Sequence, residues 1–247
     1  MIIIPCCAKK STIAEGARTR ALAFEKELGH YRDALMVSLT DNPNLWTFHC
    51  KREKQAPPKN QYLPQRNSTK VLPALFRYIG RLYAELSDEA KRKTLDPVGP
   101  VYILSALYGL IQPTDEIADY DLMMTDTCED PVCLSAFPPG AAHSVWGLWK
   151  SAFSASAISF GDPEFVLGFV SDKYNEVAHS LVCSKTRRKD YNQVKVVDGN
   201  SSETSPLRGR FLSAGLRELS RHGMAEWTAL ASDPRFPRIK IVRLPCR

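Results

Sequence analysis

The sequence predicts an α/β protein with one mixed, mostly parallel sheet, helices on both faces and a basic cleft at the strand ends. Two observations support this fold class. Short apolar runs typical of buried strands alternate along the chain with segments of helical periodicity. With 247 residues and 44% hydrophobic content, the chain is long enough to bury a full core. We therefore interpret residues 1–247 as a single domain.

Five apolar runs are predicted to be strands. They are rich in Val, Ile, Leu and Phe, and polar or turn-forming residues follow most of them, as expected for strands that lie inside a sheet. In chain order they cover residues 1–5, 101–104, 165–170, 194–197 and 239–244.

Helical spacing of apolar residues lies between these strands. The clearest stripe runs from Leu72 to Leu86, and Asp96-Pro97 ends that element. In chain order the expected helices cover about 18–39, 70–93, 144–153, a segment starting near 171, 211–221 and 225–231. Three segments are expected to be irregular. They are the loop insertion 41–68, which holds four prolines, the segment 125–142, and the polar, basic segment 199–210.

Charge is divided into three blocks along the chain. Residues 1–97 carry 17 Lys and Arg against 10 Asp and Glu, residues 98–181 carry 2 against 11, and residues 182–247 carry 14 against 6, which sums to the net charge of +6. Two basic arms thus flank an acidic centre. Basic blocks suit a polyanion, because neutralised phosphates release condensed counterions, although each block alone is also explained by a solubilising surface.

The composition also predicts the cellular compartment. No apolar run is long enough to span a bilayer, and the apolar start MIII is too short for a secretory signal. We therefore expect a cytoplasmic protein without membrane contact. Seven cysteines in such a chain predict reduced thiols rather than a disulfide framework.

Polar residues follow three of the predicted strands. CCAKKS follows the first strand, SALYGL the second, and SDKY the third. Ligands of open α/β sheets bind beyond the carboxyl ends of the strands, so these segments share one site if their strands are neighbours. The segment after 104 also holds Asp115, Glu116, Asp119 and Asp121, a density of polar groups that suits either a site or a solvated, helix-capping loop.

The segment LSALYGLIQPTDEIADYDLMM resembles the signature of the YaaA family of peroxide-stress proteins. In that family a strand leads to Ser-x-x-Tyr-Gly-Leu, then Pro-x-Asp, then Tyr-x-Leu-x-Met. ALFRYIGRLY, VWGLWKSAF and FVSDKYNEV resemble further family segments in the same order, and IPCCAKKS is similar to the Pro-Cys-Ser-x-Lys opening of domains appended to enzymes that modify 7-deazaguanine in archaeal RNA. The resemblance implies a connection with oxidative stress and DNA binding in a basic cleft, and with nucleobases.

These residues lead to a hypothesis of base excision from DNA. Asp115 or Asp119 would position water at C1′, Tyr108 or Tyr120 would stack on a flipped base, and Ser105 and Ser171 would bond its edges. The catalytic candidates are Asp115, Asp119, Cys6 and Tyr108, and the pocket candidates are Ser105, Tyr120, Ser171, Tyr174 and Cys7. The alternatives are a non-enzymatic DNA-binding stress protein and an enzyme for a small free nucleobase-like metabolite.

Lysines and arginines of the basic arms are the candidates for binding phosphate. They are Lys9, Lys10, Arg77, Lys185, Arg187, Arg188, Arg208 and Arg210. Lys9 or Lys10 would also depress the pKa of a neighbouring thiol. We expect no metal and no cofactor, because no pair of Cys or His residues has a recognised zinc spacing. The expected partner is nucleic acid in the form of double-stranded DNA, and no obligate protein partner is inferred.

Overall fold

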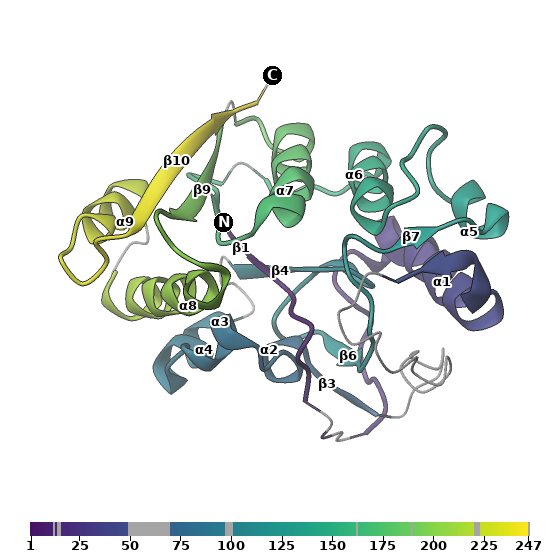
Figure 1. The fold of residues 1–247 in the computed structure, drawn as a ribbon, viewed down its shortest axis with the longest axis horizontal. Helices are drawn as coiled ribbons and strands as arrows, with labels where there is room; N and C mark the ends of the chain where they lie inside the picture. The colour runs from purple at the N-terminus through teal and green to yellow at the C-terminus, as the bar shows by residue number, and fades with distance from the viewer. Residues whose placement is uncertain are drawn as a thin grey trace.

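The central feature of the computed structural model is a twisted sheet that divides the helices into two layers (Figure 1). The structure describes residues 1–11, 13, 16–48, 70–96, 101–161, 163–188, 190–219 and 223–246. Within these residues the sheet has six strands in the order β10-β9-β8-β1-β4-β5. They are β1 (Ile2–Pro5), β4 (Val101–Ser105), β5 (Gly109–Ile111), β8 (Leu167–Gly168), β9 (Asp190–Val196) and β10 (Ile239–Pro245).

Strand directions confirm the predicted mixed, mostly parallel sheet. β1 runs parallel to both β4 and β8, and β8 runs parallel to β9. The edge strands β5 and β10 are antiparallel to their neighbours. Two small antiparallel pairs lie beside the sheet: β2 (Trp46–Thr47) with β7 (Thr127–Cys128), and β3 (Val71–Pro73) with β6 (Glu116–Ala118).

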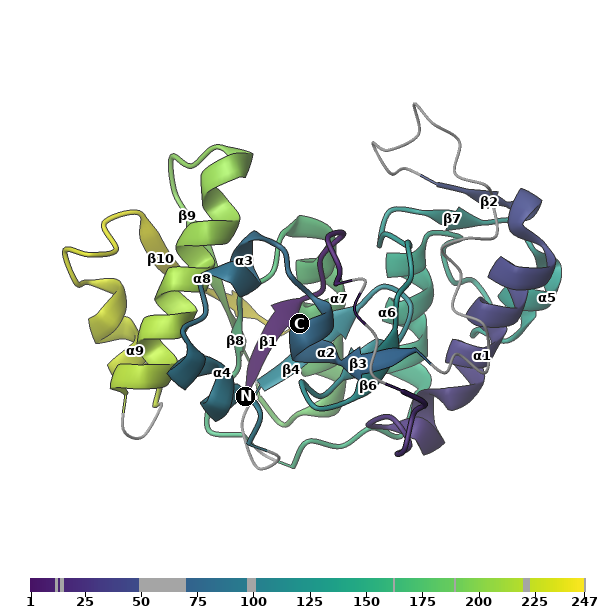
Figure 2. The ribbon, with the colours of Figure 1, turned by 90° about the horizontal axis from the view of Figure 1, so that it is seen from below.

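Helices cover both faces of the sheet, as predicted (Figures 1 and 2). On one face α6 (Val145–Ala155) packs against α7 (Asp172–Lys185). The other face carries α2 (Ala74–Arg77), α3 (Arg81–Ala84), α4 (Asp88–Thr94), α8 (Ser201–Glu218) and α9 (Met224–Ala231). The helix α1 (Glu25–Asp41) lies at one end beside α5 (Pro131–Ser135). A 3₁₀ turn, Pro43–Leu45, follows α1.

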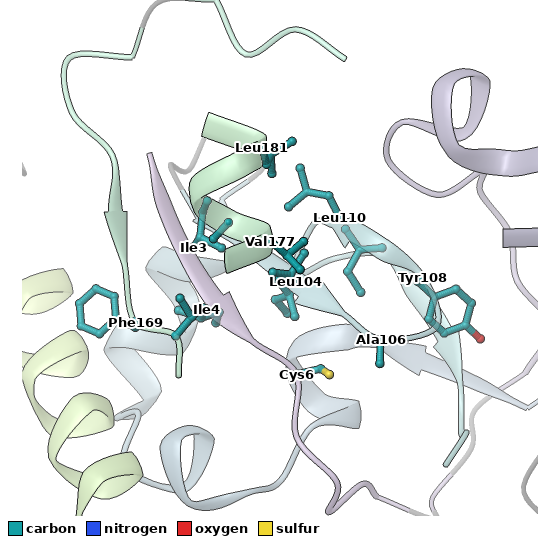
Figure 3. Packing of buried hydrophobic residues seen from close by; sticks show 14 of the residues in the cluster. Ile3, Ile4, Cys6, Leu104, Ala106, Tyr108, Leu110, Phe169, Val177 and Leu181 are labelled. Carbon is teal, nitrogen blue, oxygen red and sulfur yellow. The ribbon is translucent and has the colours of Figure 1, made fainter. Parts of the chain in front are cut away.

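The core is centred on β1. Ile2, Ile3 and Ile4 have no exposed area, because helices cover both faces of this strand. Figure 3 shows Ile3 and Ile4 among the side chains of the neighbouring strands, with Val177 and Leu181 of α7 close by. These two residues are four positions apart and therefore face the same side of α7.

The predicted helix over 70–93 is wrong, because this segment is one short strand and three short helices. Tyr78 has an extended backbone, and α3 begins after Gly80. The next helix, α4, begins after Ser87, whose hydroxyl accepts the Ala90 N–H. Leu72, Leu75, Leu82 and Leu86 are buried as the stripe predicted, but Ile79 is 41% exposed, because the chain is extended at Tyr78 and each short element turns its own side chains inward.

The predicted polar loop at 199–210 is also wrong, because it forms the first half of α8. Asn200 caps this helix by accepting the N–H groups of Ser202 and Glu203. Pro206 lies inside the helix, where it cannot donate to the carbonyl of Ser202. Arg81 donates to that carbonyl instead, at 3.1 Å. A distant side chain thus replaces the missing backbone hydrogen bond.

Smaller differences concern element boundaries and cysteines. The first helix begins at Glu25 rather than near 18, the strand expected at 165–170 is shortened to β8, and the strand expected at 194–197 begins at Asp190. Cys183 and Cys246 form a disulfide, contrary to the expected reduced thiols. Of the predicted insertion 41–68, residues 41–48 end α1 and form the 3₁₀ turn and β2, and the remainder lies outside the described residues.

The order of the parallel strands creates a topological switch point. From β1 the chain adds β4 on one side, then crosses to the other side of β1 to add β8 and β9. The connections leave β1 and β8 in opposite directions, so a crevice is expected at their carboxyl ends. In the described part of the chain, no helix is long and apolar enough to cross a membrane.

Candidate functional site

Two predicted site residues meet at the switch point. The pairing of β1 with β4 continues to Cys6, whose N–H donates to the carbonyl of Leu104 at 2.9 Å. After β8, the helix α7 begins with Ser171 as its N-cap, which places Tyr174 in the first turn. The Cys6 Sγ and the Tyr174 hydroxyl lie 3.0 Å apart. The expectation that the strand-end segments converge is therefore confirmed for these two.

Three buried hydroxyls form a closed triangle next to this pair. The Tyr78 hydroxyl lies 3.2 Å from Ser105 Oγ and 2.8 Å from the Tyr120 hydroxyl, and Ser105 Oγ lies 2.8 Å from the Tyr120 hydroxyl. Three hydroxyls at these distances can each donate one hydrogen bond and accept another. Burial raises the pKa of Tyr78 and of Tyr120 well above the ordinary value, so both phenols stay neutral.

Further groups complete the surroundings of the triangle. The Tyr83 hydroxyl donates to the carbonyl of Pro5 at 2.8 Å, at the end of β1. The Lys10 Nζ lies 4.0 Å from the centre of the Tyr120 ring, a cation–π contact. We define the strand-end site by these residues: Cys6, Cys7, Lys10, Tyr78, Tyr83, Ser105, Tyr120 and Tyr174.

Cys7 is held as a neutral thiol. Its Sγ donates to the carbonyl of Lys9 at 2.9 Å and accepts the N–H of Gly80 at 3.2 Å. Burial, followed by the neighbouring Cys6, raises the Cys7 pKa to about 11. The prediction that nearby lysines depress the pKa of a thiol is wrong for Cys7, because desolvation outweighs the charge of Lys10.

Asp115 is engaged in structure. Its Oδ2 accepts the N–H of Gln112 at 2.9 Å and the N–H of Ala23 at 3.0 Å. These bonds close the turn before β6 and attach the segment that precedes α1. Burial raises the pKa of the carboxyl above its ordinary value, against the effect of the two N–H donors. Both contacts of Oδ2 are thus explained by the fold.

Tyr108 is likewise occupied by the backbone. Its hydroxyl accepts the N–H of Ala118 at 3.2 Å, and its own N–H donates to Ser105 Oγ at 3.1 Å. The side chain is 1% exposed. Figure 3 shows its ring at the far end of the core from Phe169. The structure therefore gives Tyr108 a packing role, and its predicted stacking on a base receives no support.

The candidates Asp119 and Ser171 lie nearer to solvent. Asp119 is half-buried, and its charge raises the pKa of Arg77, which burial otherwise lowers. Ser171 is exposed at the start of α7, and its side chain makes no capping hydrogen bond there.

Much of the acidic centre serves turns of the backbone. Glu116 accepts the N–H of Thr19 at 2.6 Å, Asp126 accepts the N–H of Met123 at 2.7 Å, and Asp130 accepts the N–H of Val132 at 3.0 Å. With Asp115, these carboxylates satisfy backbone donors that no helix or strand pairs. Four of the eleven carboxylates of the acidic block thus have a structural role.

The predicted phosphate-binding residues separate into two groups. Arg77, Arg208, Lys185 and Arg188 donate to backbone carbonyls, so these side chains already have a structural role. Arg77 and Arg208 are also buried, at 1% and 8% exposure. Lys9, Arg187 and Arg210 are exposed, and Lys10 is half-buried over Tyr120.

Sequence reasoning missed two tyrosines of the strand-end site. The spacing of apolar residues predicts one long helix over 70–93, in which Tyr78 and Tyr83 would be ordinary surface or core residues. In the structure Tyr78 is extended, and an isolated bridge pairs it with Lys10. The RYIG segment within ALFRYIGRLY was the available signal, because it is part of the family resemblance.

The fold and this site define a class: an α/β protein whose sheet has a parallel centre and whose switch point is lined by thiols and neutral phenols. Comparison with known proteins agrees with the motif at 101–124. The family model of the peroxide stress protein YaaA matches residues 1–204. The chain belongs to this family. It is also 24% identical over 189 residues to a UPF0246 protein of Lactiplantibacillus plantarum, a match covering 75% of this chain and 71% of that protein.

Proposed function

We propose that this chain is a DNA-binding protein of peroxide stress, and that it holds the sugar-phosphate backbone of a duplex at the strand-end site. Membership of the peroxide stress protein YaaA family supports the physiological setting. The observation that carries the binding proposal is the set of lysines around the carboxyl ends of the strands, which are Lys9, Lys10 and Lys173.

These lysines come from two distant parts of the chain. The carbonyl of Lys9 accepts the N–H of Ile79, which fixes residues 9 and 10 beside the segment that carries Tyr78. Lys173 directly precedes Tyr174, the partner of Cys6. Lys9, Lys10 and Lys173 thus lie around the place where Cys6 and Tyr174 meet, although the Lys173 Nζ is also paired with Glu176 at 3.0 Å.

The charges close to the strand-end site suit a polyanion better than the acidic block of the sequence suggests. Asp115 and Glu116 lie in the acidic centre, but their carboxylates accept backbone N–H groups. Lys9 is exposed, and Lys10 has one face on Tyr120 and is half-exposed. Phosphates contacted by such lysines would release counterions, so the binding constant falls steeply with salt.

Fluorescence anisotropy with a labelled duplex at several salt concentrations tests this proposal. We expect Lys9→Ala/Lys10→Ala to weaken binding and to reduce the slope of log K against log salt by about 2, about 1 for each phosphate contact. The matched control is Lys91→Ala/Lys93→Ala on α4, which leads to the amino end of β4 and thus to the opposite edge of the sheet. Equal slopes for the two double variants would refute the proposal.

Base excision stays a prediction, and Asp119 is the candidate carboxylate for positioning water that no backbone N–H engages in the contacts described above. Asp115 and Tyr108 are engaged by backbone N–H groups, whereas Asp119 is half-buried near the site. Mass spectrometry of duplexes that carry normal, damaged or hypermodified bases would detect a released base. Release that is lost in Asp119→Asn with unchanged duplex binding would establish the enzyme. Absence of salt-dependent binding would instead favour a small nucleobase-like substrate.

A further inference from the structure

The last strand, β10, ends beside α7 (Figure 1), and three side chains of types that can bind metal come together there. His179 and Cys183 are four residues apart on α7 and so lie on one face of the helix. Cys246 follows the end of β10. The His179 ring nitrogen and the two sulfurs all lie within 4.8 Å of one another, and each residue is half-buried. Among the described residues, this is the group of three ligands that satisfies such a distance.

In the oxidised chain these residues form a clamp. Cys183 and Cys246 are joined by a disulfide, with their Cα atoms 5.2 Å apart. The His179 Nε2 lies 3.0 Å from the carbonyl of Pro245, to which it donates, and 3.5 Å from Cys183 Sγ. The disulfide therefore fastens the end of the edge strand β10 to α7.

We propose that the reduced chain binds a zinc ion through His179, Cys183 and Cys246, and that the disulfide replaces the metal when the two thiols are oxidised. Zinc holds sulfur at about 2.3 Å and imidazole nitrogen at about 2.0 Å, so a tetrahedral site separates the two atoms by about 3.5 Å. The separation of His179 Nε2 and Cys183 Sγ is already 3.5 Å.

Little movement is needed to complete the site. After reduction the two sulfurs only have to separate to about 3.8 Å, which is the edge of a tetrahedron with zinc–sulfur bonds of about 2.3 Å. His179 would carry its proton on Nδ1, give up its bond to the carbonyl of Pro245 and present Nε2 to the metal. Water takes the fourth position, as in zinc sites with three protein ligands. Thiolate and imidazole together favour zinc over magnesium or calcium.

Conversion to the disulfide consumes one peroxide. The thiolate of one cysteine attacks an oxygen of hydrogen peroxide, the O–O bond breaks, and a sulfenic acid and a hydroxide ion form. The second thiolate then attacks the sulfenic sulfur, the S–S bond forms, and a second hydroxide leaves. Two electrons pass from the two sulfurs to the peroxide. Zinc loses two of its three protein ligands and dissociates.

This site is separate from the proposed DNA contact. Cys246 lies beyond residues 1–204, which the family model matches. A failure of duplex binding would leave the zinc proposal unaffected, and the reverse also holds.

The test uses the full chain, reduced and kept without oxygen. After incubation with zinc and removal of the excess, elemental analysis should find about one zinc per chain, and cobalt in its place should give a thiolate charge-transfer band. Addition of hydrogen peroxide should release the zinc in step with the appearance of the Cys183–Cys246 peptide. A reduced, folded chain that gives no such cobalt band would overturn the proposal without any substitution.

Substitutions then identify the ligands. Cys246→Ser and His179→Ala should each lower zinc affinity by more than about 100-fold, because loss of even an outer-sphere partner costs about 10 to 100-fold. Cys133→Ser and His143→Ala are the matched controls, being a buried thiol and an exposed histidine outside the cluster. Equal zinc affinity in the ligand variants and the controls would also overturn the proposal.

Discussion

Substitution of Arg77 distinguishes a structural role from a phosphate-binding role for this arginine of the first basic arm. Its guanidinium is buried and donates to four backbone carbonyls, those of Ile117, Ser11, Ile13 and Lys70. A hydrogen bond from a charged donor contributes about 1.5 to 3 kcal/mol, so four at the lower value total about 6 kcal/mol. Water reaches the three carbonyls that are only partly buried and offsets part of the loss. We expect Arg77→Met to lower the free energy of unfolding by about 3 to 4 kcal/mol.

The assay is urea-induced unfolding, with duplex binding measured on the same samples. Arg77→Lys keeps the charge but loses the fork that reaches several carbonyls, so its loss should be about 2 kcal/mol. Arg210→Met is the control, because Arg210 is exposed and only approaches Glu85 at 3.9 Å, a contact worth about 0 to 1 kcal/mol. If Arg77→Met unfolds like the wild type but binds DNA less tightly, the structural interpretation is refuted.

Three further predictions concern residues around the site. Because burial raises the pKa of Asp115, the folded state binds its proton more tightly than the unfolded state does, and this carboxyl loses stabilising effect as pH rises through the raised pKa. Urea titrations should thus show Asp115→Asn gaining on the wild type as pH rises from below the ordinary carboxyl pKa to above the raised one, and a pH-independent difference would contradict the reasoning. The Cys7 thiol, with a pKa of about 11, should react with iodoacetamide at pH 8 about 100-fold or more slowly than a free cysteine, as peptide mass spectrometry would measure. Gly109→Ala should lower the free energy of unfolding by about 3 kcal/mol in the same assay, since the φ of Gly109 is +66° and a Cβ would lie 2.6 Å from the Trp149 ring. Gly140→Ala, at φ +79° with nothing within 4 Å, should lower it by only about 1 kcal/mol. Equal losses would show that the contact with Trp149 is unimportant.

The strands could be predicted because burial on both faces leaves a direct mark on the sequence. Ile2, Ile3 and Ile4 are apolar without interruption, as a central strand between two helix layers requires. The strand-end segments were found for a related reason, since polar residues after such runs mark the edge of a sheet. The meeting of Cys6 with Tyr174 follows once β1 and β8 are neighbours, but strand order itself is not written in either segment.

The errors arose where distant residues supply what the local sequence lacks. The polarity of SSETSPLRGR and the presence of Pro206 predict a loop. This segment forms a helix because Asn200 caps it and Arg81, far away in the chain, serves the carbonyl that Pro206 cannot. The apolar stripe at 70–93 fits one long helix, but it fits several short elements equally well. The chain in fact breaks at Tyr78 and Gly80, which the spacing of apolar residues alone does not reveal.

The distribution of charge at the strand-end site constrains its ligand. Its interior holds phenols whose pKa values burial raises, and the Cys7 thiol, which is neutral for the same reason. The nearby cations Lys9 and Lys173 are exposed. A phosphate placed inside would meet neutral donors and would lose its hydration, whereas a phosphate outside would meet lysines and remain solvated. An uncharged group with polar edges gains the most inside, because neutral hydroxyls donate and accept without paired charges. Under the proposed function, the exposed lysines would contact phosphates, and the buried phenols and the Cys7 thiol would be left to neutral, hydrogen-bonding groups.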